Sequence, residues 1–200
     1  CNVIHNYQAR IIWQRRVEGR LQPRGTAVVR CRLEPFAIYI GFDDDLSQGE
    51  HWVYPSDDYG QVVVRKPTDI GQVLSYVPLH DPALARHRTV HITEWGVEGI
   101  LNDLEQKIER ERLGAGSVDY LGLGESDSAR LLHHIRALSS TGHLRTDYYL
   151  DGRHFLPVLV VSYDSVGELV EYVKFESVEL NVPELNDDDA FNARTLFHKL

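Results

Sequence analysis

The first segment of the chain alternates apolar and polar residues with a period of two. The alternation runs over residues 7–17, where apolar side chains recur at odd positions and polar ones lie between them: Tyr7, Ala9, Ile11, Trp13 and Val17 against Gln8, Arg10, Gln14 and Arg16. Successive side chains of a strand point to opposite faces of a sheet, so this period is typical of a half-buried strand. The segment therefore predicts a long β-strand at the start of the fold.

Further strand-like runs follow, separated by turn residues such as Gly19 and Gly49. We expect strands at residues 25–32, 36–42, 51–54 and 61–66. The stretch 67–88 contains Pro67, Pro78 and Pro82, so we expect it to be irregular with at most a short strand at 73–77. Its role, as a lid or as a rigid connection, stays open.

One segment has helical periodicity. Thr93 is a suitable N-cap for a helix over residues 94–113, whose apolar residues recur at helical spacing: Val97, Ile100, Leu101, Leu104 and Ile108. The other face is charged and is predicted to be solvated: Asp103, Glu105, Lys107, Glu109 and Arg110. The pattern indicates a surface helix laid on a sheet.

After this helix the pattern returns to strands, at residues 118–123, 129–138, 143–150, 155–163 and 169–180. We expect a mainly β (α+β) fold, with a curved antiparallel sheet or incomplete β-barrel of about 10 strands. The helix must bury its apolar stripe, and the concave face of the sheet is the available place. At 200 residues, one domain spanning residues 1–200 can share one core.

The charge balance excludes one class of partner. The chain has 30 acidic and 21 basic residues, a formal net charge of -9, which disfavours binding to nucleic acid. No apolar run is long enough to span a bilayer as a helix.

The two cysteines, Cys1 and Cys31, lack metal or redox spacing, which excludes a zinc ribbon. The sequence begins with Cys1 and contains no Met, so we expect a processed lipoprotein acylated at Cys1, or a chain lacking its first residues. A disulfide between the two cysteines and two unpaired thiols both remain open.

Catalytic and metal signatures are weak. No serine lies in a G-x-S-x-G elbow, and the histidine group His80, His87 and His91 falls in a stretch where a helix is not expected. We therefore expect no enzymatic activity, no cofactor and no metal.

Three segments together resemble a bacterial envelope family of unknown function. Its members read roughly ERVxGxLxP, then PFxVYxxF, then SRHPITExGI before a helix. This chain has Arg16, Gly19, Leu21 and Pro23, then EPFAIYIGF at 34–42, then RHRTVHITEWGVEGILNDL at 86–104. It departs from the family in having RHRTVHITE where RHPIT is usual.

The C-terminal half is similar in layout to the lipoprotein carriers LolA and LolB. The similarity lies in the hairpin YDSVGELVEYVKF and in the tail residues Asn181, Pro183, Asp189 and Phe191. It implies an incomplete β-barrel with an apolar cavity that holds acyl chains, and a function in binding. Fold analogy alone does not establish what is bound.

From these features we predict a non-enzymatic binding protein of the bacterial periplasm or outer membrane, for an apolar ligand, lipid or acylated partner. The expected cavity lining is Ile38, Ile40, Val62, Val64, Val158, Val160, Val170 and Val173. The alternative is a structural accessory subunit docked on a larger envelope complex. An unfilled apolar cavity favours the first, and a packed interior with an exposed apolar patch favours the second.

Overall fold

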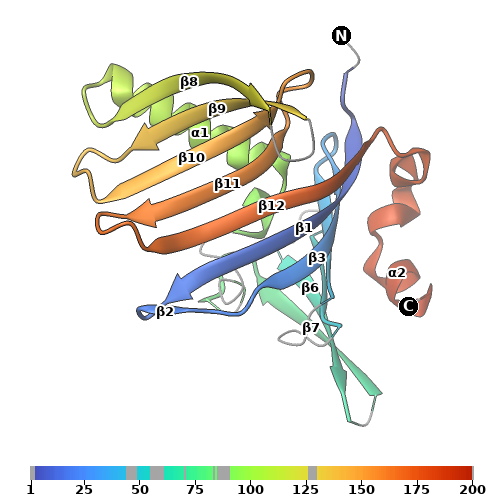
Figure 1. Cartoon of the computed structure of the whole chain (residues 1–200). Helices are drawn as coiled ribbons and strands as arrows, with labels where there is room; N and C mark the ends of the chain where they lie inside the picture. The colour runs from blue at the N-terminus through green and yellow to red at the C-terminus, as the bar shows by residue number, and fades with distance from the viewer. Residues whose placement is uncertain are drawn as a thin grey trace. The chain divides into compact units, whose positions relative to one another are not determined.

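The computed structural model describes residues 3–43, 49–54, 61–69, 71–82, 84, 91–125 and 130–199 (Figure 1). The expectations for Cys1 and His87 lie outside these residues. The chain forms two compact parts. The first comprises Cys1–Ile11, Gly25–Gly96 and Glu176–Leu200, and the second comprises Ile12–Arg24 and Val97–Phe175.

Most of the described chain is β-strand. The strands are β1 (Asn6–Val17), β2 (Arg20–Leu21), β3 (Gly25–Arg32), β4 (Ala37–Phe42), β5 (His51–Tyr54), β6 (Gln61–Thr68), β7 (Gly71–Pro78), β8 (Ser117–Glu125), β9 (Leu131–Leu138), β10 (Leu144–Asp151), β11 (Pro157–Asp164) and β12 (Leu169–Leu180). They pair in the order β7-β6-β5-β4-β3-β1-β12-β11-β10-β9-β8, with β2 paired to β1. β7 and β8 are the two ends of this order. The expected open antiparallel sheet is confirmed.

In the first part, the C-terminal segment covers one face of β4, β5 and β6. It consists of the 3-10 turns η3 (Pro183–Asn186) and η4 (Asp188–Phe191) and the helix α2 (Ala193–Lys199). Its buried residues Leu185, Phe191 and Phe197 pack against Tyr39 and Val63 of the strands. This covering segment was not predicted from the sequence.

In the second part, α1 (Val97–Arg112) lies on one face of the strands and contacts β8 and β11 (Figure 1). The predicted helix is confirmed, but its predicted start is wrong. Thr93 lies in the 3-10 turn η2 (Ile92–Glu94), and α1 begins after Gly96. Among the described residues, no helix combines the length and apolarity needed to cross a membrane.

The stretch after residue 66 is more regular than expected up to Pro78, and the short strand expected at 73–77 lies within the longer β7. β6 and β7 form a hairpin with continuous pairing from Gln61–Pro78 to Thr68–Gly71. Pro67 is tolerated because β5 pairs only with residues 63–65 of β6. The missing N–H of Pro67 therefore removes no hydrogen bond to a neighbour on that side.

Candidate functional site

Four of the predicted lining residues share one face of the sheet in the first part. Ile40 of β4 pairs with Trp52 of β5, which pairs with Val64 of β6. Ile38 and Val62 lie two residues away on the same face. The structure therefore brings this quartet together.

The quartet is packed by the protein's own side chains. Ile38, Ile40 and Val62 have no exposed surface, and the indole of Trp95 covers the neighbouring aromatic residues. The Trp95 ring centroid lies 6.1 Å from that of Trp52 and 5.4 Å from that of Phe42, in both cases edge to face. Such aromatic pairs fill volume with well-defined geometry.

The other four predicted residues lie in the second part. Val160 of β11 pairs with Val173 of β12, and both are buried. Val160 also pairs with Tyr148 of β10, which places these two valines on the face that carries α1. Val158 and Val170 are half-buried.

Polar groups lie under α1 on this same face. Lys107 Nζ donates to Tyr148 Oη at 2.5 Å and to Thr146 Oγ1 at 3.3 Å, and it pairs with Asp103 at 2.7 Å. Burial, followed by the negative charge of Asp103, raises the pKa of Tyr148. Lys107 was predicted on the solvated face of the helix, and this prediction is wrong because its long side chain turns back onto the sheet.

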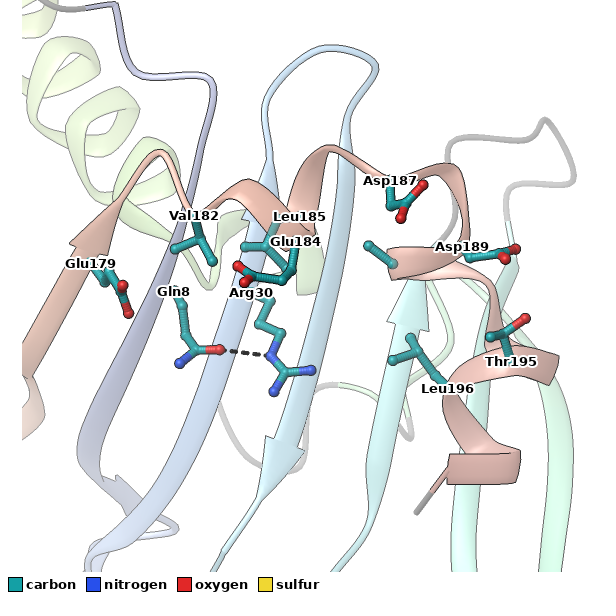
Figure 2. Close-up of a pocket in the computed structure, with 11 residues that line it drawn as sticks. Gln8, Arg30, Glu179, Val182, Glu184, Leu185, Asp187, Asp189, Thr195 and Leu196 are labelled. Carbon is teal, nitrogen blue, oxygen red and sulfur yellow. Dashed lines mark hydrogen bonds between the residues drawn. The ribbon is translucent and has the colours of Figure 1, made fainter.

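A separate pocket lies beside the C-terminal segment (Figure 2). Its volume is about 650 Å³, and it is lined by Gln8, Arg30, Glu179, Val182, Glu184, Leu185, Asp187, Asp189, Ala190, Thr195 and Leu196. Arg30 Nε donates to Gln8 Oε1 at 2.8 Å, and the Arg30 guanidinium lies 5.2 Å from the ring centroid of Tyr39. The lining is largely polar, and none of the predicted lining residues belongs to this pocket.

Apolar side chains are exposed on the two end strands. On β7, Val73 and Leu74 are each 48% exposed and Tyr76 is 62% exposed. On β8, Tyr120 and Leu123 are also exposed. The burial pattern of β7 is exposed at nearly every position, so strand periodicity carries no signal for this surface.

The histidines form no metal centre among the residues that the structure describes. The rings of His80 and His91 lie 4.8 Å apart, edge to face. An edge-to-face arrangement at this distance is a common packing geometry of aromatic rings.

Solved structures with a similar fold have low sequence identity to this chain. An uncharacterized conserved protein from Thermus thermophilus has a TM-score of 0.52 and 13% identity, over 90% of this chain and 80% of that chain. A chain in the complex of Pseudomonas aeruginosa MucA and MucB has a TM-score of 0.54 and 14% identity. That match covers 88% of this chain and 52% of that chain, so this chain spans about half its length.

The Mycobacterium tuberculosis lipoprotein LppX has a TM-score of 0.48 and 12% identity, over 90% of this chain and 88% of LppX. No curated protein matches the sequence. The motifs between Arg16 and Leu104 predicted a family of unknown function, and this prediction is confirmed. The model of the family described as "Protein of unknown function (DUF1571)" matches residues 4–194, and the chain belongs to this family.

Proposed function

We propose that the protein is a non-enzymatic binding protein of the bacterial cell envelope that docks on a protein partner through the outer edge of β7. The observation that carries this proposal is the exposure of Val73, Leu74 and Tyr76 on an end strand. The predicted lining residues of β4 and β6 are themselves buried. A packed interior with exposed apolar surface is typical of a subunit that docks on a partner.

The edge of β7 has the properties of a strand-addition site. Its sequence, GQVLSYVP, contains no charged residue, and its pairing with β6 has no register shift. Charges and bulges are the usual protection of an edge strand against pairing with another chain. The opposite end strand, β8, has both, with a register shift between Tyr120 and Gly122 and an exposed Asp119. An extended segment of a partner is therefore expected to add to the sheet at β7 and not at β8.

The comparison with MucB supports a protein partner at the level of fold. A chain of the MucA and MucB complex shares the fold at a TM-score of 0.54, and in that structure two proteins are bound to each other. The fold of this chain is thus compatible with docking on a protein. At 14% identity, the partner in that complex is not inferred for this chain.

Site-specific photo-cross-linking in the native envelope tests the proposal. A photoreactive residue at Tyr76 is expected to cross-link one protein, whereas the same residue at Val166, 80% exposed in the turn before β12, is not. Leu74→Glu places a charge on the edge, opposite Arg65 of β6, and is expected to abolish the Tyr76 cross-link without lowering the melting temperature. Equal cross-linking at both positions, or none at Tyr76, contradicts the proposal.

A second candidate function is the binding of an apolar ligand, such as a lipid or the acyl chain of a partner. It is supported by the uninterrupted apolar face of Ile38, Ile40, Val62 and Val64, on which Trp95 and its aromatic neighbours lie. In this proposal a ligand chain takes the place of the Trp95 indole. Val158, Val160, Val170 and Val173 are the proposed lining in the second part.

Tryptophan fluorescence distinguishes this candidate from docking. A fatty acid with a brominated chain is expected to quench the fluorescence saturably, and Trp95→Ala is expected to bind it more tightly because the indole no longer competes for the space. Absence of saturable quenching in both proteins contradicts lipid binding and leaves the β7 proposal intact.

A further inference from the structure

The face of the second part that is turned away from α1 carries a cluster of cationic side chains around one buried carboxylate. Asp147 is only 3% exposed. Its Oδ1 accepts hydrogen bonds from His134 Nε2 at 2.9 Å and from Arg136 Nε at 2.8 Å. Arg145 Nε lies 3.2 Å from Oδ2. One carboxylate therefore faces two guanidinium groups and an imidazole.

The cluster lies on the side of the strands that α1 does not cover. Thr146 and Tyr148, the neighbours of Asp147 in β10, both accept hydrogen bonds from Lys107 of α1. Side chains alternate along a strand, so Asp147 and Arg145 point to the opposite face. Figure 1 views the strands from this side, with α1 behind them.

The donors of this cluster exceed its acceptors. Burial alone raises the pKa of Asp147, but the hydrogen bonds from His134 and Arg136 and the charges of Arg136 and Arg145 lower it below its ordinary value. Asp147 is thus a stable anion that directs the Nε edges of both guanidinium groups toward itself. Among the described residues, the hydrogen bonds give the terminal amino groups of Arg136 and Arg145 no acceptor. Their side chains are 35% and 41% exposed.

Arg145 is the less satisfied of the two arginines. Its register partners are Leu138 on β9 and Tyr163 on β11, neither of which is acidic. Its Nε is buried and makes no well-aligned hydrogen bond despite its approach to Asp147. Arg136 has a further acid nearby, because the exposed Asp119 of β8 is its register partner. A buried guanidinium N–H without an aligned acceptor is unusual in a stable protein.

Aromatic rings hold the cluster in place. The guanidinium of Arg145 lies 4.5 Å from the ring centroid of Tyr163, and the ring of Tyr149 stacks on His134 at 4.4 Å. Burial raises the pKa of Tyr149, with a further contribution from Asp147, so this hydroxyl remains a donor at neutral pH. The arginines are thus preorganised, which reduces the entropy lost when they bind a ligand.

We propose that Arg136 and Arg145 form a binding site for a phosphate-type oxyanion. Two guanidinium groups offer more donors than the two oxygens of a carboxylate can accept, whereas a phosphate group presents additional oxygens. Two guanidinium groups lie together here, with the Asp147 carboxylate between them and the exposed Asp119 beside Arg136 alone, so an added oxyanion has Arg145 as its least neutralised partner. The oxyanion comes from free phosphate or from a phospholipid headgroup. The site is separate from both surfaces of the proposed function.

Titration with inorganic phosphate at constant ionic strength, followed by NMR of the arginine Nε–H groups, tests the site. Saturable shifts at Arg136 and Arg145 are expected with phosphate and not with chloride. Arg145→Gln is expected to weaken phosphate binding by about tenfold or more, because hydrogen bonds to charged groups are strong. The matched control is Arg153→Gln, a change of an exposed arginine in the turn after β10, which is expected to leave binding unchanged.

Because Arg145 also neutralises Asp147, a second variant separates binding from folding. Arg145→Lys keeps the charge beside Asp147 but removes the planar fork, so the melting temperature is expected to persist while phosphate binding falls. Co-sedimentation with phosphatidylcholine vesicles, with and without phosphatidylglycerol, then identifies the source. If the protein sediments with the vesicles and Arg145→Gln does not, the bound oxyanion is a phospholipid headgroup. If the protein binds phosphate but does not sediment, the oxyanion is a soluble phosphate. The proposal is overturned if phosphate gives no saturable shift, or if Arg145→Gln and Arg153→Gln bind it equally.

Discussion

Tyr39 Oη of β4 and His51 Nδ1 of β5 lie 2.8 Å apart, and the ring of Phe197 from the C-terminal helix lies 6.3 Å from the His51 ring. Burial raises the pKa of Tyr39, so its hydroxyl is protonated and donates to a neutral imidazole. Burial, aided by the charge of Arg65, lowers the pKa of His51 to about 4. This hydrogen bond therefore requires His51 to be uncharged.

The stability of the protein is expected to fall as the pH drops from about 6.5 to about 4. His51 has an ordinary pKa of 6.5 and a pKa of about 4 in the folded chain, so the unfolded chain binds the proton more readily. The contribution of neutral His51 to the free energy of unfolding is complete above pH 6.5 and is lost as the pH falls through 4. Thermal melts across this range measure the effect, and His51→Gln is expected to flatten the profile. A wild-type slope that persists in this variant contradicts the assignment to His51.

Gly41 is the position where the Tyr39–His51 pair leaves no room for a side chain. A Cβ on Gly41 would lie 2.6 Å from Tyr39 Oη and 3.2 Å from His51 Nδ1. Gly41→Ala is expected to separate this pair and to lower the free energy of unfolding by about 1–3 kcal/mol, the usual cost of overpacking. The control is Gly124→Ala in β8, where a Cβ meets no atom within 4 Å. Urea unfolding of both variants measures the difference, and equal midpoints refute the steric argument.

Asn181 links the end of β12 to the start of the chain through three hydrogen bonds. Its Oδ1 accepts from His5 N at 2.8 Å, its Nδ2 donates to Val3 O at 3.1 Å, and its own N–H donates to Asn6 O at 2.8 Å. Its φ of 54° lies in the left-handed region, where asparagine and glycine are favoured. The tail motif that resembles the lipoprotein carriers thus has a structural role at this residue.

Two substitutions separate these contributions of Asn181. Asn181→Gly keeps the backbone conformation and loses the side-chain hydrogen bonds, at an expected cost of about 1–2 kcal/mol in the free energy of unfolding. Asn181→Ala loses the hydrogen bonds and strains the backbone, so a further loss of about 1 kcal/mol is expected. Chemical denaturation of both variants measures the order. A glycine variant less stable than the alanine variant contradicts this account.

Sequence periodicity predicted the strands well because most of them bury one face against a neighbour. β1, for example, alternates through Tyr7, Ala9 and Ile11, and it extends from Asn6 to Val17 as expected within one residue. β7 lacks such a signal because Val73 and Tyr76 are exposed, and prolines around it suggested irregular structure. Its pairing with β6 depends on backbone hydrogen bonds, which side-chain patterns do not record.

The C-terminal cover was missed for a related reason. α2 has only 7 residues, too few for a helical period to be recognised. One signal was present: Asn192 Oδ1 accepts from Arg194 N at 3.0 Å and from Thr195 N at 3.3 Å, which is the hydrogen bonding of an N-cap. The inward direction of the Lys107 side chain could not be predicted from the sequence, because its partners Thr146 and Tyr148 lie on a strand about 40 residues away in the chain.

The C-terminal segment is expected to be part of the core of the first part and not a removable tail. Phe191 is 2% exposed and packs in the cluster with Ala37 and Leu185, and the guanidinium of Arg32 lies 5.3 Å from its ring centroid. Phe191→Ala removes this packing and leaves a cavity, so we expect a loss of about 3–5 kcal/mol in the free energy of unfolding. Arg32 is itself buried and loses the aromatic face that it contacts.

The control for this prediction is a phenylalanine on the surface. Phe155 is 57% exposed and stacks on His133 at 4.7 Å between ring centroids, so Phe155→Ala is expected to cost about 1 kcal/mol or less. Guanidinium unfolding followed by circular dichroism gives both values. If the two variants lose the same stability, the C-terminal segment contributes no more to the core than a surface contact does. A large loss of stability for Phe191→Ala, without one for Phe155→Ala, shows that the C-terminal segment is bound tightly to the sheet face of Tyr39 and Val63. A partner that binds this face must then displace the segment, at a cost in free energy similar to that loss.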